Sequence, residues 1–584
     1  MSEAQSHHQL TEKLDELYEF DREPVTANKL CSSGYFAASY AGEHIAATEF
    51  VIGALFVSWG ASVFDIFVGL LLGNLLAVLS WAFICAPIAV RTRLTLYWFV
   101  RKIGGPYLAF IYNISNALLY CVLAGTMVTV SAASLRIPFG IPTQTLWYPT
   151  DWRFVIVVLL AGAIMIYFAI LGFKRFAQFS AVCSPWMISM FLVAGMMSLA
   201  FLANYDGNGR VTSFSQFWSL ASKYVWTGSP LVAEEKLGFW HIVAFAWICN
   251  LAMHFGLSDM AVFRYAKKSY YGLNTWTGMF IGHYVAWICA GMLGACAALM
   301  LNTPITKLDS GDIGYVVLGF CGPIAVLLSG LTTAIPTLYK AGLGLQSVTP
   351  NWPRWVVTLV AGSVTTIIAC FPFVFTEMLR FLGLYGLLLL PIGAVAFTEF
   401  WIFPKIGLTR YWVSHRKLFL NWPALITWVV TIAVSMVLWR NNTIHLFFLF
   451  IPVWFVSVAM YICLAYMAGA KMSGVQDTEI DYRGTAEVEP VKVAANTTQK
   501  NNLFKLIGFI ALGSLLITLL LPLKVLFAGK TEFDAVFASV RSLLIWPTMA
   551  YFIFGTIWYV RYERAKTAPV EASQNEQVQD KVHC

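Results

Sequence analysis

Charged residues are scarce in this sequence, at 12% of its 584 residues, whereas hydrophobic residues make up 59%. A soluble protein of this length could not keep so much apolar surface from water, which excludes the ordinary globular classes. The apolar runs are about 20 residues or longer and do not alternate in polarity, which excludes a membrane β-barrel. The sequence therefore predicts an all-α polytopic membrane protein.

Several chemical signatures are also missing. The 11 cysteines form no CxxC pair, so we expect neither a disulfide framework nor a cysteine metal site. No complete phosphate-binding loop (Gly-x4-Gly-Lys-Ser/Thr) and no HExxH motif occurs, so we expect no enzyme activity, no ATP-driven step and no cofactor. The net charge of +8 comes largely from basic residues in short loops, where they set membrane topology, so nucleic acid is not an expected partner.

About fourteen apolar runs are long enough to span a bilayer. Their expected bounds are 36–60, 62–89, 106–134, 153–173, 177–203, 238–263, 273–301, 314–346, 354–376, 378–402, 420–439, 444–467, 504–527 and 540–560. The placement of basic residues favours the inner (cell) membrane with both termini in the cytoplasm. The outer loop 204–237 is rich in aromatic residues and predicts a short interfacial helix.

The chain is expected to divide into six parts. These are an N-terminal cytoplasmic tail (1–35), a ten-span core (36–402), spans 11 and 12 (403–468), a cytoplasmic linker (469–503), two extra C-terminal spans (504–561) and a cytoplasmic tail (562–584). The linker is polar and acidic, which is typical of a flexible connection.

Two spans carry polar interruptions. Span 1 contains Gly42-Glu43-His44, and span 6, five spans later, contains the segment 254–259 around Gly256. Ionisable groups in hydrocarbon are costly and usually functional. Interruptions in corresponding spans are typical of inverted-repeat transporters, whose unwound helices line a cavity. Glycines that serve only helix packing are the alternative. We predict a core of five plus five helices with broken spans 1 and 6, plus about four further spans.

Span 8 offers a row of hydroxyl groups. Ser329, Thr332 and Thr333 stand at i, i+3 and i+4, on one helix face. Together with the backbone carbonyls of Ala38 and Ala41 near the span 1 break, they could bind Na⁺, which we favour over a proton as the coupling ion. Alternatively, the hydroxyls bond to carbonyls of their own helix.

These motifs resemble those of the nucleobase–cation symporters (the purine–cytosine permease family), within the broader five-plus-five inverted-repeat, or LeuT-type, superfamily. The resemblance covers roughly residues 36–465. Besides the span 8 hydroxyls, it rests on Gly73-Asn74 in span 2, on Ser258-Asp259 followed by Phe263-Arg264-Tyr265 in span 6, and on Pro391-x-Gly393 with Glu399-Phe400 in span 10.

The resemblance implies a substrate pocket between spans 1, 3, 6 and 8, in which aromatic rings hold a flat heterocycle. Trp247 is similar to the family's aromatic position in span 6. Asn116 and Tyr120 lie at i, i+4 on span 3, near the family's amide and aromatic positions.

Four further residues are candidates for substrate contact. Glu43 and His44 could bind substrate N–H and carbonyl groups, or could pair with each other or with His254 as a structural lock. Asn250 and His254 share a face of span 6 and could line the pocket, although His254 could equally be satisfied by the backbone.

Three residues are candidates for coupling or gating. Glu49 could be a proton-coupling carboxylate, or could lie hydrated at the outer mouth. Asp259 and Arg264 could form a cytoplasmic gate pair, or could be solvated at the helix end. His283 we expect to be structural.

We therefore predict a secondary active transporter that couples uptake of a small polar solute, a nucleobase or related nitrogen heterocycle, to a cation by alternating access. The alternatives are an amino-acid or amine symporter on the same fold, and a membrane sensor that does not transport.

Overall fold

The computed structural model describes residues 19–20, 22–144, 146–207, 209–231, 236–349, 352–373, 378–472 and 502–582. Within these ranges, 11 helices are long and apolar enough to cross a membrane. The predicted spans 1, 6 and 9 appear as the shorter apolar helices α3 (Glu49–Ser58), α10 (Phe239–Ile248) and α16 (Arg354–Ala369). The expected polytopic helical fold is confirmed.

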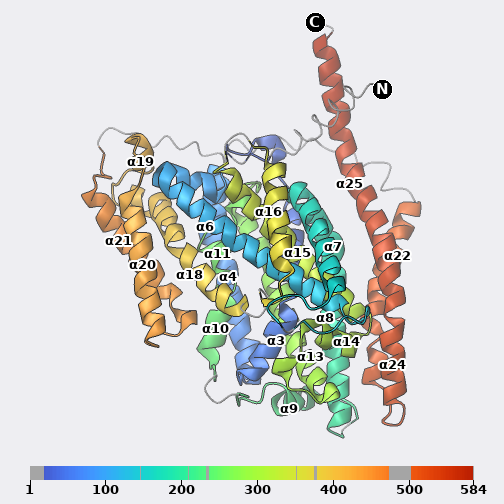
Figure 1. Cartoon of the computed structure of the whole chain (residues 1–584). Coiled ribbons are helices and arrows are strands. Elements are labelled where there is room, and N and C mark those ends of the chain that lie inside the picture. The colour runs from blue at the N-terminus through green and yellow to red at the C-terminus, as the bar shows by residue number, and fades with distance from the viewer. Residues whose placement is uncertain are drawn as a thin grey trace.

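The helices form a core bundle with further helices on two sides (Figure 1). In the core, α6 (Leu96–Leu135) packs along α15 (Cys321–Gln346), and α7 (Trp152–Ile170) packs against α16. On one side lie α20 (Trp422–Arg440) and α21 (Phe450–Met467). On the other side α22 (Asn502–Leu520), α24 (Phe533–Leu543) and α25 (Ile545–Val582) lie beside α8 (Phe173–Tyr205).

Span 1 is broken as predicted. Helix α2 (Ser33–Glu43) ends immediately after Gly42, and α3 begins at Glu49, so residues 44–48 are not helical. Gly42 lies against α8, where an added Cβ would come within 2.5 Å of the Ser180 side-chain carbon. The glycine therefore serves packing as well, so the two interpretations of Gly42 are compatible.

Span 6 is broken twice. After α10 come α11 (Leu251–His254) and α12 (Met260–Phe263), with residues 255–259 unwound between the last two. Leu257 has a φ of 62°, which a side chain with Cβ rarely adopts. Backbone hydrogen bonds from Ser258 to Ala252 and from Asp259 to Met253, both 3.2 Å, hold this turn in place.

Some boundaries differ from the prediction. Residues 310–318 form a separate helix, α14 (Ser310–Leu318), and span 8 begins only at Cys321, because Gly319 adopts a φ of 60° between them. Helix α25 continues to Val582, so the segment expected as a C-terminal tail is largely helical. Residues 473–501 of the predicted linker lie outside the described residues. The loop 204–237 contains a short helix as expected, α9 (Phe214–Tyr224), and its interfacial position stays a prediction.

Span 10 packs against the span 6 break at Gly393, which lies on α18 (Met378–Phe397). A Cβ on Gly393 would lie 1.9 Å from the carbonyl oxygen of Phe255, so Gly393→Ala should push the two backbones apart. We expect a loss of about 1–3 kcal/mol in the free energy of unfolding. Gly513→Ala in α22 is the matched control, because no atom lies within 4 Å of its added Cβ. The melting temperatures of the two variants are measured by thermal unfolding in detergent. Equal melting temperatures would contradict close packing of Gly393 against Phe255.

Candidate functional site at the two helix breaks

A buried lysine joins the two broken spans. The Nζ atom of Lys340, on α15, lies 2.8 Å from Oε1 of Glu43 and 2.7 Å from Oδ1 of Asp259. Glu43 ends α2 at the span 1 break, and Asp259 ends the unwound segment of span 6. The three residues are at most 3% exposed. One ammonium group thus ties both breaks to span 8.

The second oxygen of Asp259 is also occupied. Tyr40 donates its hydroxyl to Oδ2 at 2.5 Å, and Trp81 donates its indole N–H to the same atom at 2.7 Å. Hydrogen bonds to an ionised acceptor are stronger than neutral ones, and a buried ion pair is stable only when its remaining lone pairs are satisfied in this way. Asp259 is therefore held as a carboxylate at a fixed point between spans 1, 2, 6 and 8.

Sequence reasoning missed Lys340, although the signal was present. Lys340 is an ionisable residue inside a predicted span, and it follows Thr333 by seven residues, which places both on one face of the helix. The rule that singled out Glu43, the cost of a charge in hydrocarbon, applies equally to Lys340. Its presence also excludes a lock of Glu43 with His44 in this structure, since Glu43 pairs with the lysine.

The hydroxyl face of span 8 meets the span 1 break. Thr333 donates to the carbonyl oxygen of Glu43 at 2.8 Å and also lies 3.0 Å from the carbonyl of Ser329. Thr332 bonds back to Leu328 at 3.0 Å, and the Ser329 hydroxyl lies 3.4 Å from the sulfur of Met187. Thr332 and Thr333 thus make the local hydrogen bonds of the alternative interpretation, whereas Ser329 does not, and Thr333 also reaches the break. Ala38 and Ala41 lie on α2, before the break.

Trp81 lies between the two predicted histidines. Its ring centroid is 5.8 Å from that of His44 and 4.7 Å from that of His254. Each histidine uses one ring nitrogen on a backbone carbonyl, His44 on Tyr40 and His254 on Trp247, both at 3.0 Å.

Three polar side-chain atoms at the two broken spans are left without a partner among the described residues. In the described part of the chain, the other ring nitrogens, His44 Nε2 and His254 Nδ1, and the amide nitrogen of Asn250 are buried without a hydrogen-bond partner. Unpaired buried polar atoms are costly, so they are expected to bind something.

The predicted span 3 and span 6 residues separate into two groups. Tyr120 hydrogen-bonds to Ser258 in the span 6 break, and the Lys340 ammonium lies 5.9 Å from its ring. Asn116 instead accepts a hydrogen bond from the hydroxyl of Tyr97 at 3.1 Å. Trp247 donates to Ser80 at 2.9 Å. Tyr120 therefore bonds to the span 6 break and Trp247 packs against Phe255 of that break with ring centroids 5.8 Å apart, whereas Asn116 bonds to another residue of α6.

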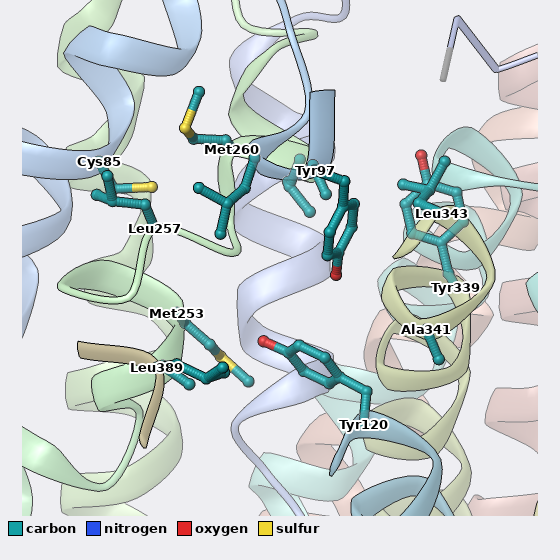
Figure 2. Packing of buried hydrophobic residues seen from close by; sticks show 14 of the residues in the cluster. Cys85, Tyr97, Tyr120, Met253, Leu257, Met260, Tyr339, Ala341, Leu343 and Leu389 are labelled. Carbon is teal, nitrogen blue, oxygen red and sulfur yellow. The ribbon is translucent and has the colours of Figure 1, made fainter. Parts of the chain in front are cut away.

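Aromatic residues of span 3 fill the space between spans 6 and 8. Figure 2 shows Tyr97 and Tyr120 between the span 6 residues Leu257 and Met260 and the α15 residue Tyr339. All five belong to one buried cluster.

The two predicted gate residues have separate partners. Asp259 pairs with Lys340, whereas Arg264 donates to the carbonyl of Phe20 at 2.5 Å and to the hydroxyl of Tyr339 at 3.2 Å. Arg264 is fully buried, so the idea that it is solvated at a helix end does not hold. Glu49 is also buried, at 2% exposed, rather than hydrated at a mouth.

Comparisons with known proteins establish the fold. No protein-family model and no curated protein matches the sequence. Among solved structures, the nucleobase-cation-symport-1 family transporter Mhp1, closed with bromovinylhydantoin bound, aligns with a TM-score of 0.60 at 16% identity, over 80% of this chain and 100% of Mhp1. Inward-facing Mhp1 aligns with a TM-score of 0.58.

A second solved transporter gives the same result. A Na⁺-coupled sialic acid symporter aligns with a TM-score of 0.55 at 12% identity, over 78% of this chain and 96% of the symporter. The chain therefore has the LeuT-type helical fold predicted from its two broken spans.

Proposed function

We propose that this chain is a secondary active transporter that couples uptake of a small polar solute to a cation gradient by alternating access. The observation that carries the proposal is the ion pairing of Lys340 with both helix breaks, at 2.8 Å and 2.7 Å. Broken helices with buried charges at their breaks are the usual place for substrate and ion sites in this type of fold. The cation-coupled symporters with the same fold support the assignment.

For the substrate, we propose a nucleobase or a related nitrogen heterocycle. The unpartnered ring nitrogens of His44 and His254 offer hydrogen-bonding atoms beside the Trp81 ring, and the unpartnered amide nitrogen of Asn250 offers a further donor on span 6, which suits a flat molecule with both donors and acceptors. An amine substrate would need a free carboxylate as its partner, and Glu43 is the candidate carboxylate at the span 1 break. Because the ammonium of Lys340 already occupies Oε1 of Glu43, the site offers a substrate imidazole and amide groups rather than a free carboxylate, which favours an uncharged ring over an amine.

Transport assays in proteoliposomes test the proposal. Labelled uracil, cytosine, hydantoin, phenylalanine and choline are offered with an inward Na⁺ gradient, an inward proton gradient or neither. We expect a gradient to drive accumulation of a heterocycle. Binding of a probe without accumulation under either gradient would contradict transport and favour the sensor alternative, and accumulation of choline or phenylalanine alone would contradict the substrate class.

The sodium prediction has its own test. Replacing both Thr332 and Thr333 by alanine removes two hydroxyl oxygens, and we expect the Na⁺ concentration for half-maximal uptake to rise about tenfold or more. Thr337→Ala is the matched control, since its hydroxyl bonds to the carbonyl of Thr333 at 2.7 Å, one turn further along α15. If the Na⁺ dependence of uptake is unchanged in the double variant, these two threonines do not bind the coupling ion.

A further inference from the structure

A second buried acidic group lies on the other side of the span 1 break. Glu49 is the first residue of α3 and is 2% exposed. Its Oε1 atom lies 3.5 Å from Nε2 of His283, in the π-helical segment η6 (Thr277–Tyr284), and the indole N–H of Trp287 donates to the same carboxyl group. His283 stacks on Trp287 with ring centroids 4.3 Å apart. The sequence alone suggested only a structural role for His283.

Among the described residues, no lysine or arginine forms an ion pair with Glu49 or His283. In the described part of the chain, the titratable groups that interact with it electrostatically are the thiol of Cys249 and the imidazole of His44. A net charge inside a membrane is costly, so the pair is most stable when neutral. Neutrality requires one bound proton, either on the carboxyl of Glu49 or, with a carboxylate, as the second proton of an imidazolium at His283.

We propose that Glu49 and His283 form a proton-binding site that is loaded and emptied once in each transport cycle. This rests on the proposed transport function and adds a proton as a coupling ion. The proton enters from water on one side in one conformation and leaves to water on the other side in the opposite conformation, so no other reactant is needed. Differential proton affinity between the two conformations provides the coupling.

The position of the pair connects it to the break. His44 directly follows the end of α2, and its ring centroid lies 5.1 Å from that of His283. Span 7 approaches His44 closely, because a Cβ on Gly278 would lie 2.8 Å from Nδ1 of His44. Nε2 of His44 and Nδ1 of His283 are both buried without a partner within the described residues. Any rearrangement of the span 1 break therefore changes the surroundings of Glu49 and His283.

Another buried carboxyl group, that of Glu399, provides a matched control. It accepts from the hydroxyl of Tyr461 at 2.6 Å and from the backbone N–H of Tyr411 at 2.8 Å, and it interacts with the charge of Arg410. This carboxyl group is thus held by fixed hydrogen-bond donors and lies near the charge of Arg410, and no histidine of the described residues hydrogen-bonds to it.

The experiment compares the wild-type protein with Glu49→Gln, His283→Gln and Glu399→Gln in proteoliposomes. For the heterocycle found in the screen, the measured quantity is uptake with an inward proton gradient divided by uptake without one. We expect this ratio to be about tenfold in the wild type and in Glu399→Gln, and to approach one in Glu49→Gln and His283→Gln. Exchange of labelled for unlabelled heterocycle across the membrane (counterflow) needs no proton gradient. A variant that retains this exchange still exposes its substrate site to both sides. A ratio near one in the wild type, or ratios unaffected by Glu49→Gln, would overturn the proposal while leaving transport intact.

A second measurement needs no solute and stays decisive if transport itself fails. NMR of histidine-labelled protein, with the His283 signal assigned from His283→Gln, follows that imidazole between pH 5 and 9. We expect Glu49→Gln to change its signal and its titration, and Glu399→Gln to leave both unchanged. A His283 signal that is identical with and without Glu49 would show that the two groups share no proton.

Discussion

Replacing Lys340 by methionine is expected to abolish uptake and to lower the free energy of unfolding by about 3–5 kcal/mol. Methionine keeps most of the side-chain volume but removes the ammonium group. Glu43 and Asp259 would then be two buried carboxylates without their shared cation. Breaking one side of a buried ion pair costs more than removing the whole pair, because the unpaired charge stays in a medium of low dielectric constant.

A triple variant separates folding from function. Changing Glu43 to Gln, Asp259 to Asn and Lys340 to Met removes all three charges and leaves groups that can still accept the hydrogen bonds of Tyr40 and Trp81. We expect this variant to recover most of the melting temperature that Lys340→Met alone loses, and to remain inactive in uptake. If the single variant unfolds like the wild type, the lysine does not hold the two breaks together.

Much of the fold follows from local sequence patterns. Apolar length predicts the spans, and polar interruptions around Gly42 and Gly256 predict the two breaks, because both signals depend on neighbours within one or two helical turns. The boundaries that differ, such as the start of span 8 at Cys321, depend on single backbone conformations like that of Gly319.

The partners of the buried charges could not be predicted in the same way. Glu43 and Lys340 are 297 residues apart, and only the packing of span 8 between the breaks brings them together. Asp259 and Arg264 are close in sequence and of opposite charge, which made a pair plausible. The structure gives each a distant partner instead, because Asp259 faces the centre of the bundle while Arg264 faces the N-terminal segment. Pairing is thus a tertiary property, whereas the cost of an unpaired charge can be recognised from the sequence.

Arg264→Met is expected to open the proposed substrate pathway to water. The opening should occur at the end of the helix bundle that the N-terminal segment crosses. This segment, residues 19–31 as far as it is described, bonds to three spans. The backbone N–H of Val25 donates to Arg93 after span 2, that of Cys31 donates to Tyr265 after span 6, and Arg22 donates to Gln346 at the end of span 8. Arg264 lies beneath the segment, where it binds the carbonyl of Phe20.

The loss of Arg264 should release the segment because several charge-assisted hydrogen bonds disappear together. The guanidinium donates to Phe20 at 2.5 Å, to Tyr339 at 3.2 Å, and lies 3.9 Å from the carboxylate of Glu19. Such bonds contribute about 1.5–3 kcal/mol each. Even one of them, if absent from the open state, shifts the balance between closed and open forms by about tenfold or more.

Cys85 reports on this opening. Its thiol is fully buried beside Asp259, in the cluster shown in Figure 2 with Leu257 and Met260. We expect a water-soluble thiol reagent to modify Cys85 about ten times faster in Arg264→Met than in the wild type, as measured by peptide mass spectrometry. Arg354→Met is the control, because this buried arginine binds the carbonyls of Ala169 and Ile170 and not the N-terminal segment. Equal modification rates in all three proteins would mean that the segment does not close the pathway, whereas faster modification in both variants would reflect general loosening of the bundle.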